Sequence, residues 1–165
     1  MKLVTSNEEN VVQETTREAF ATIKDGSISK SLAMLTRMRG IGPATASLLL
    51  STYDAINVPF FSDELFRYVN YDGEGARGWD RKINYNKKEY DLLCERVQQL
   101  RDRVNEDRTD EEAVTALELE QLTWVLAPNS RRKQDDDDVA KPETKNKNEA
   151  RGDIERPVKR RKTTT

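Results

Sequence analysis

Residues 36–67, TRMRGIGPATASLLLSTYDAINVPFFSDELFR, decide the fold that the sequence predicts. The stretch starts with the end of a helix and continues through a tight turn, Met38-Arg39-Gly40-Ile41-Gly42-Pro43. Glycine tolerates a positive φ, and proline is favoured at the first position of a helix because it has no amide hydrogen to leave unpaired. We therefore predict that a helix begins at Pro43, that Ile41 packs inward, and that the backbone N–H groups of Gly40 and Gly42 face an anion.

A second helix start follows an apolar connector, Val58-Pro59-Phe60-Phe61, which we expect to be extended and packed inward. The preceding helix, 43–53, is apolar on nearly every side, and we predict that it is buried. Ser62 can cap the next helix, whose first residues are Asp63 and Glu64. Two roles stay open for Asp63: a functional carboxylate at the edge of the core, or an ordinary first-turn acid that stabilises its helix. Glu64 is a weaker candidate for the functional carboxylate.

Two blocks of this stretch resemble a known family. Arg39-Gly40-Ile41-Gly42-Pro43-Ala44-Thr45-Ala46 resembles the hairpin of the helix-hairpin-helix (HhH-GPD) DNA glycosylase superfamily, and Phe60-Phe61-Ser62-Asp63-Glu64 resembles the block that carries its aspartate. Both blocks also resemble those of its eukaryotic Amun-like branch. The resemblance covers about residues 3–127 and implies an all-α, DNA-glycosylase-like helical bundle. It also implies more helices before the hairpin than this sequence holds, so we expect the domain at 1–127 to be incomplete at its N-terminus.

The resemblance also implies a site and a reaction. Asp63 would stabilise the positive charge that develops on the sugar as the N-glycosidic bond of a flipped nucleotide breaks, and would orient or deprotonate the attacking water. Ala44 stands where bifunctional members carry a lysine, so the implied enzyme is at most a monofunctional base-excision-repair glycosylase. From the residues themselves we expect no bound metal and no cofactor. The residues implied to bind the DNA backbone are Arg39, Gly40, Ile41, Gly42, Ala44 and Thr45.

Two other functions remain open at this point. A non-catalytic DNA-binding or chromatin-binding module could use the same hairpin, and a protein-interaction module could keep it as a purely structural element. Arg37 and Arg39 flank the turn and either contact phosphates or are solvated surface residues.

Helix signals continue on the N-terminal side of the hairpin. Ser6-x-x-Glu9 has the pattern of a capping box and predicts a helix over about 8–24. Asp25-Gly26 ends that helix, and Ser27 is predicted to cap the next one, the first arm of the hairpin.

Two more helices are predicted on the C-terminal side. Asn86-x-x-Glu89 has the pattern of a capping box and precedes a narrow apolar seam, and Thr109-x-x-Glu112 is predicted to open a final helix that runs through Val125. The connector at 58–61 is the longest strand-like run, so the body is predicted to be all-α. The seam residues are Tyr90, Leu93, Val97, Leu100 and Val104.

Residues 70–85 form a glycine-containing loop that is too long for a simple turn, and such loops are often functional. Trp79 lies within it. Its side chain either stacks on a nucleic-acid base or closes the core under the loop.

Charge separates the chain into a body and a tail. The chain holds 28 Lys+Arg and 30 Asp+Glu, of which 12 and 8 follow residue 127, so the tail carries +4 and the body −6. Affinity for DNA depends largely on neutralising phosphates, so an acidic body predicts weak, non-specific, backbone-mediated binding. The absence of histidine excludes His-based metal sites and bases, and one cysteine, Cys94, excludes an internal disulfide.

The tail, 128–165, contains almost no large apolar residues and is predicted to be disordered. Its end, Pro157-Val158-Lys159-Arg160-Arg161-Lys162, resembles a nuclear import signal, with a generic basic tail as the alternative. We expect a monomer in the nucleus with DNA as its partner, or a nuclear protein in the alternative functions. No apolar run approaches the roughly 20 residues of a membrane span, so no membrane partner is expected.

Overall fold

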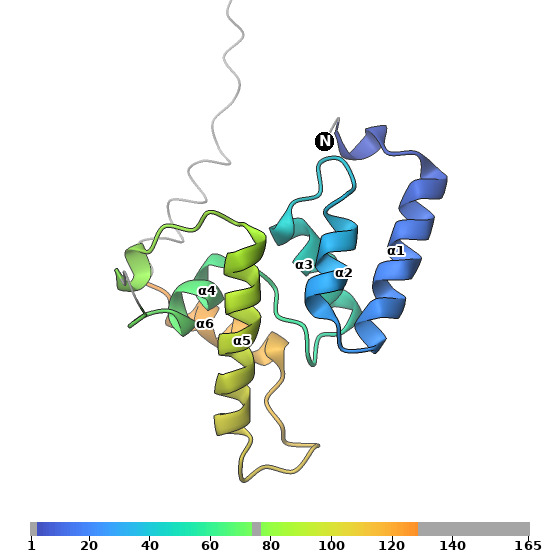
Figure 1. Cartoon of the computed structure of the whole chain (residues 1–165). Helices are drawn as coiled ribbons and strands as arrows, with labels where there is room; N and C mark the ends of the chain where they lie inside the picture. Colours follow the sequence, from blue (N-terminus) through green and yellow to red (C-terminus); the bar gives the residue numbers. More distant parts are fainter. Residues whose placement is uncertain (1–2, 74–76, 129–165) are drawn as a thin grey trace, which may run out of the picture.

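The computed structural model describes residues 3–73 and 77–128, and in these ranges the chain forms helices and loops with no strand (Figure 1). The all-α prediction is therefore confirmed for the described part of the chain. The tail, with its predicted disorder and import signal, lies almost entirely outside the described residues. The helices are α1 (Glu9–Lys24), α2 (Ile28–Leu35), α3 (Pro43–Tyr53), α4 (Asp63–Val69), α5 (Lys87–Val104) and α6 (Ala116–Leu126), with 3-10 turns η1 (Val4–Ser6) and η2 (Gly78–Asp80).

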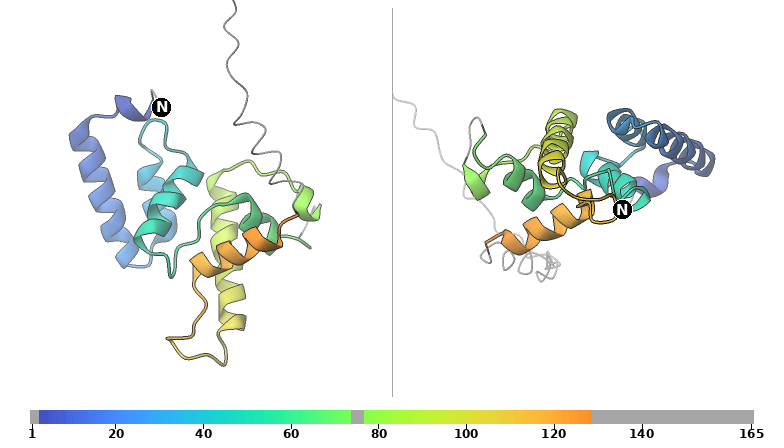
Figure 2. Two further views of the ribbon diagram at one scale, coloured as in Figure 1. Left: turned by 180° about the vertical axis from the view of Figure 1, so that it is seen from behind. Right: turned by 90° about the horizontal axis from the view of Figure 1, so that it is seen from below.

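The helices fall into two groups that share one core. Helices α1, α2 and α3 lie together on one side, and α4, α5 and α6 on the other, in both orientations (Figures 1 and 2). Helix α1 packs along α2, α2 contacts both α3 and α5, and α4 contacts α5 and α6. Fully buried side chains from both groups belong to the same cluster: Leu32, Leu35, Leu50, Phe61, Leu65, Phe66, Tyr90 and Leu93.

The connector between α3 and α4 joins the two groups, and its inward packing is confirmed. Val58 and Phe61 are each 1% exposed. The Phe61 amide donates to the Ser47 hydroxyl of α3 at 3.0 Å, and the Tyr90 hydroxyl of α5 donates to the Pro59 carbonyl at 3.0 Å. These buried bonds satisfy backbone groups that an extended segment leaves unpaired, and they hold the chain that enters α4.

Two of the predicted helix caps do not form, although both helices begin where predicted. The Ser6 hydroxyl donates to the Leu3 carbonyl within η1, and Glu8 is the N-cap of α1, so the Ser6-x-x-Glu9 capping box does not form. Ser27 precedes α2 as predicted, but its side chain makes no capping hydrogen bond. In each case the α-helix begins where predicted to within a residue, because apolar spacing sets the boundary without the cap.

The last helix begins later in the sequence than predicted. The box at Thr109 closes only a local turn, in which the Glu112 amide donates to the Thr109 carbonyl at 3.0 Å. The capping box that starts α6 lies six residues later: the Glu118 amide donates to the Thr115 hydroxyl at 3.1 Å, and the Thr115 amide donates to the Glu118 carboxylate at 2.8 Å. Two patterns of the same type follow each other here, and the one next to the buried Ala116 and Leu119 is the one that starts the helix.

Helix α3 is not buried on all sides, contrary to the prediction. Its inner face contributes Ala46, Ser47 and Leu50 to the interior, whereas Leu48 and Leu49 are 45% and 37% exposed. Because α3 is apolar on both faces, its composition carried no signal for which face would meet α2 and the connector.

Candidate functional site: the hairpin and the start of helix α4

The hairpin between α2 and α3 is closed by its own backbone. The Ile41 amide donates to the Met38 carbonyl at 3.2 Å, and Ile41 packs against the core as predicted. Gly40 has a φ of +77°, in the left-handed region that favours glycine. A Cβ built on Gly40 would lie 2.9 Å from the Val4 side chain, so a larger residue would also collide with η1.

One side of the hairpin is covered by the start of the chain, through Asn7. The Arg39 amide donates to Asn7 Oδ1 at 2.8 Å, and Asn7 Nδ2 donates to the Arg39 carbonyl at 2.9 Å. The same Nδ2 donates to the Val4 carbonyl at 2.8 Å, which ties η1 to the hairpin. Sequence reasoning missed Asn7, because no local pattern links residues 32 positions apart.

The other side of the hairpin is open. A Cβ built on Gly42 meets nothing within 4 Å, and Gly42 and Thr45 are exposed while Ala44 is half-buried. In the described part of the chain, the backbone amides of Gly40, Gly42, Ala44 and Thr45 have no hydrogen-bond partner. Three of these amides lie at the N-terminus of α3, where the helix dipole adds partial positive charge. The arrangement can accept an anion such as a phosphate oxygen.

The two arginines beside the turn have exposed side chains. Arg39 is held by its backbone through Asn7, and Arg37 lies one position before Met38, on the same side of the turn. Together with residues of η1 and α1 they line a hollow of about 280 Å³. Both guanidinium groups are therefore next to the hairpin and reachable from solvent.

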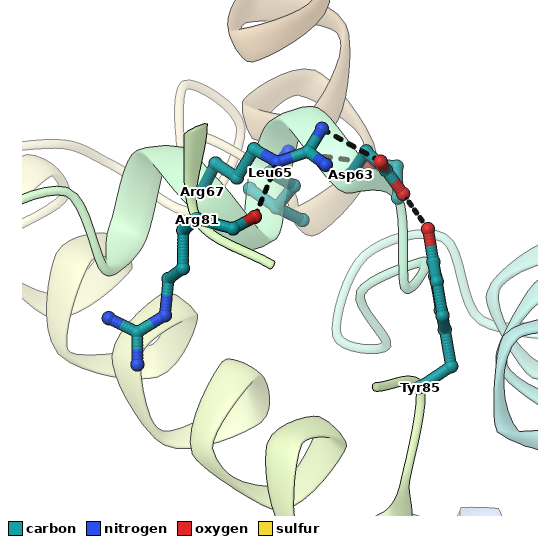
Figure 3. A network of polar contacts seen from close by, with 6 residues as sticks. Asp63, Leu65, Arg67, Arg81 and Tyr85 are labelled. Carbon is teal, nitrogen blue, oxygen red and sulfur yellow. Dashed lines mark hydrogen bonds and ion pairs between the residues drawn. The ribbon is translucent and has the colours of Figure 1, made fainter. Parts of the chain in front are cut away.

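Asp63 is placed by the cap of α4, as predicted. The Leu65 amide donates to the Ser62 hydroxyl at 3.3 Å, and Asp63 takes the first position of the helix. Its carboxylate has two partners (Figure 3): Arg67, whose guanidinium lies 2.7 Å from Oδ2, and the Tyr85 hydroxyl, which donates to Oδ1. The Asp63 side chain is 34% exposed and that of Arg67 only 16%.

These contacts tie the loop after η2 to the start of α4. Arg67 also donates from Nε to the Arg81 carbonyl at 3.1 Å (Figure 3), and the centroid of the Tyr85 ring lies 5.5 Å from that of the Phe61 ring. Burial and the hydrogen bond to Asp63 raise the pKa of Tyr85, so its hydroxyl keeps its proton and remains a donor. Tyr85 was not singled out from the sequence. Its φ of +53°, rare for a non-glycine residue, shows that the surrounding contacts determine this position.

A second carboxylate approaches the start of α4 from α6. Burial raises the pKa of Glu120, and the nearby charge of Glu64 adds to this effect, whereas a hydrogen bond with Ser62 opposes it. Glu64, the weaker candidate for a functional carboxylate, is half-buried beside this pair.

The hairpin and Asp63 are linked only indirectly. Ser47, one turn into α3, bonds the Phe61 amide, two residues before Asp63. Within residues 3–73 and 77–128, no hydrogen bond or ion pair joins the hairpin itself to Asp63. Asp63 has its partners in α4 and the loop at 81–85, so in the described residues the predicted DNA-binding and catalytic residues are held by different contacts.

Trp79 lies outside the main core. Its ring contacts Tyr68 at 6.5 Å and Tyr71 at 6.2 Å between centroids, and it is half-buried. The described residues contain no group of three potential metal ligands among Cys, Asp and Glu, and none of their helices is long and apolar enough to cross a membrane.

No protein-family model, curated protein or solved structure matches the chain. The glycosylase resemblance therefore depends on the two sequence blocks alone, and the function has to be argued from the site.

Proposed function

We propose that this protein binds the phosphate backbone of DNA through the hairpin, residues 38–45, without reading base sequence. The observation that carries the proposal is the group of unpaired amides at Gly42, Ala44 and Thr45, at the open N-terminus of α3. Amides aimed at one point with a helix dipole behind them bind phosphate oxygens. Because phosphate contacts position a protein without specifying sequence, the expected binding is non-specific.

Arg37 and Arg39 supply the positive charge that a phosphate chain requires. Both side chains are exposed beside the turn. The body around them is acidic, with a net charge of −6 for residues 1–127, so long-range attraction to DNA is weak. We expect low affinity that falls as salt rises, with a shallow slope that reflects only a few neutralised phosphates.

N-glycosidic bond hydrolysis at Asp63 is the second candidate function. It is supported by the resemblance of residues 60–64 and by the partial exposure of Asp63 at the start of α4. Hydrolysis would require the carboxylate to leave Arg67 and Tyr85, because a carboxylate neutralised by a guanidinium stabilises a cationic sugar poorly. Non-catalytic binding of the DNA backbone needs no such rearrangement, and for this reason we propose it first.

Two substitutions at one position test the hairpin. In Gly42→Asp a carboxylate occupies the N-cap, where it accepts from the amides of α3 and repels phosphate, while it supports the helix. In Gly42→Ala the amides stay free, and the backbone at residue 42 (φ −91°) suits alanine. Fluorescence anisotropy with a labelled DNA duplex at low salt should show binding at least about 10-fold weaker for Gly42→Asp, and within about 2-fold of the original chain for Gly42→Ala. Equal binding by Gly42→Asp would refute the proposal.

Duplexes that carry uracil, an alkylated base or an oxidised base separate the two candidates. The proposed function predicts no abasic product from any of them. An abasic product that disappears in Asp63→Asn while DNA binding persists would establish the glycosylase instead.

A further inference from the structure

A pocket that includes no hairpin residue is lined by aromatic rings and arginines. It lies between the end of α4, η2, α5 and the last turn of α6, and its volume is about 510 Å³. That volume is within the range of small-molecule sites. None of the hairpin residues or Asp63 lines it, so neither function proposed above uses this pocket.

The aromatic wall consists of Tyr68, Tyr71 and Trp79. The Trp79 ring lies edge-on to Tyr71 and tilted to Tyr68, and Tyr71 is 45% exposed. Gly78 fixes this arrangement, because its φ is +54° and a Cβ built on it would lie 3.0 Å from the Tyr71 ring. The Trp79 ring already contacts both tyrosine rings without a ligand, which lowers the entropy lost on binding.

The opposite wall carries Arg96 and Arg103 from α5. They are seven residues apart, two turns of a helix, and so lie on the same face. In the described ranges neither guanidinium has a carboxylate within 4.0 Å or a hydrogen-bond acceptor. The lining also contains Asp72, so two arginines and one aspartate give it a net charge of +1. Two unpaired guanidinium groups beside exposed rings favour a ligand that is both anionic and planar.

We propose that this pocket binds an unpaired nucleobase together with its neighbouring phosphate, as presented by single-stranded DNA. The base stacks on the face of the Trp79 ring with Tyr71 at its edge, and the phosphate pairs with Arg96 or Arg103. Stacking on aromatic rings accompanied by arginine is how proteins hold single strands without sequence preference. A peptide ligand fits less well, because the only aliphatic side chains in the lining are Val69, Leu100 and Leu126.

Tryptophan emission tests the proposal directly, because the chain has only two tryptophans. In Trp124→Phe, Trp79 is the only tryptophan, so emission excited selectively from tryptophan reports on it alone. Adding a single-stranded oligothymidylate of about 12 nucleotides should quench it, whereas a blunt duplex of the same length should not. Emission that does not respond to the single strand overturns the proposal. A response to a synthetic peptide of residues 129–144, which include the acidic run Asp135–Asp138, but not to the oligonucleotide, also overturns it and assigns the pocket to an acidic protein segment.

Affinity measurements on variants give a second, independent readout. Trp79→Ala and the double variant Arg96→Ala/Arg103→Ala should each weaken binding of labelled oligothymidylate about 5- to 100-fold. Both arginines are exposed, so the double variant keeps its fold even if Trp79→Ala does not. Gln98→Ala, an exposed substitution elsewhere on α5, is the matched control and should bind normally.

The hairpin variant keeps this proposal separate from the proposed function. Gly42→Asp should lower duplex binding and leave the Trp79 response to the single strand in place. If Gly42→Asp abolishes duplex binding while the pocket variants bind oligothymidylate as well as the original chain, the hairpin function stands and the pocket proposal fails. If instead the pocket variants lose oligothymidylate binding while Gly42→Asp binds the duplex as well as the original chain, the pocket proposal stands and the hairpin function fails.

Discussion

At the scale of single residues, the site depends on side chains that form hydrogen bonds with residues far away in the sequence. Asn7 bonds both the amide and the carbonyl of Arg39, and Tyr85 bonds Asp63 across 22 positions. The first holds one wall of the hairpin, and the second fixes the loop that precedes α5. Arg39 and Asp63 were candidate site residues from the sequence. Their partners, Asn7 and Tyr85, were not.

Replacing Asn7 should loosen the hairpin. Asn7→Ala removes two hydrogen bonds to the Arg39 backbone in a partly exposed setting, so we expect about 1–2 kcal/mol of lost stability in urea unfolding. Duplex binding should weaken as well, because the turn is less well ordered. Gln13→Ala, on the exposed surface of α1, is the control and should change stability by less than about 0.5 kcal/mol. An unchanged unfolding midpoint for Asn7→Ala would show that the hydrogen bonds between Asn7 and Arg39 do not stabilise the fold.

Glu120 makes the stability depend on pH. Its pKa is raised by burial, so the folded state binds its proton more tightly than the unfolded state does. The contribution of Glu120 to the free energy of unfolding is therefore fully present below its pKa in the unfolded state, and it is lost as pH rises through its pKa in the folded state. We expect Glu120→Gln to be more stable than the original chain at pH 7 and to lose that advantage toward pH 4, as measured by unfolding midpoints across this range. A stabilisation that does not vary with pH would assign the effect to packing.

At the scale of elements, caps and packing decide where each helix begins. The sequence offers Thr109-x-x-Glu112 and Thr115-x-x-Glu118, and only the second starts α6. Local capping is worth about 1 kcal/mol, which is less than the burial of Ala116 and Leu119, so packing selects between two equivalent signals. The same reasoning applies to Ser6, whose hydroxyl bonds within η1 while α1 begins after Glu8.

Substitutions of Thr109 and Thr115 should therefore differ in their effect on stability. Thr115→Ala removes the N-cap of α6 and should lower stability by about 0.5–2 kcal/mol. Thr109→Ala removes a hydroxyl that contacts only the exposed Glu112 carboxylate, and should have an effect near zero. Denaturant unfolding of both variants checks the difference, and equal losses would mean that the helix begins at the earlier box.

At the scale of the whole molecule, the sequence predicted the helical class, the turn at residues 38–43 and the apolar connector, because glycine, proline and buried aromatic residues have strong local signatures. It did not predict which face of α3 is exposed, since both faces are apolar. The ion pair of Asp63 with Arg67 has a local spacing of four residues within α4, whereas Tyr85 reaches Asp63 only once the loop has folded back, so that contact could not be predicted. The positions of the candidate residues were thus readable from the sequence, whereas distant partners such as Asn7 and Tyr85 depend on tertiary structure.

The central claim is that the open amides at the start of α3 bind phosphate, and amide chemical shifts test it most directly. In a ¹H–¹⁵N correlation spectrum of the labelled full chain, titration with a short DNA duplex at low salt should shift the signals of Gly40, Gly42, Ala44 and Thr45 in a saturable way. The shifts should be reversed by added salt, because phosphate binding releases counterions. Signals of these four residues that stay in place while DNA binds elsewhere on the protein would contradict the account.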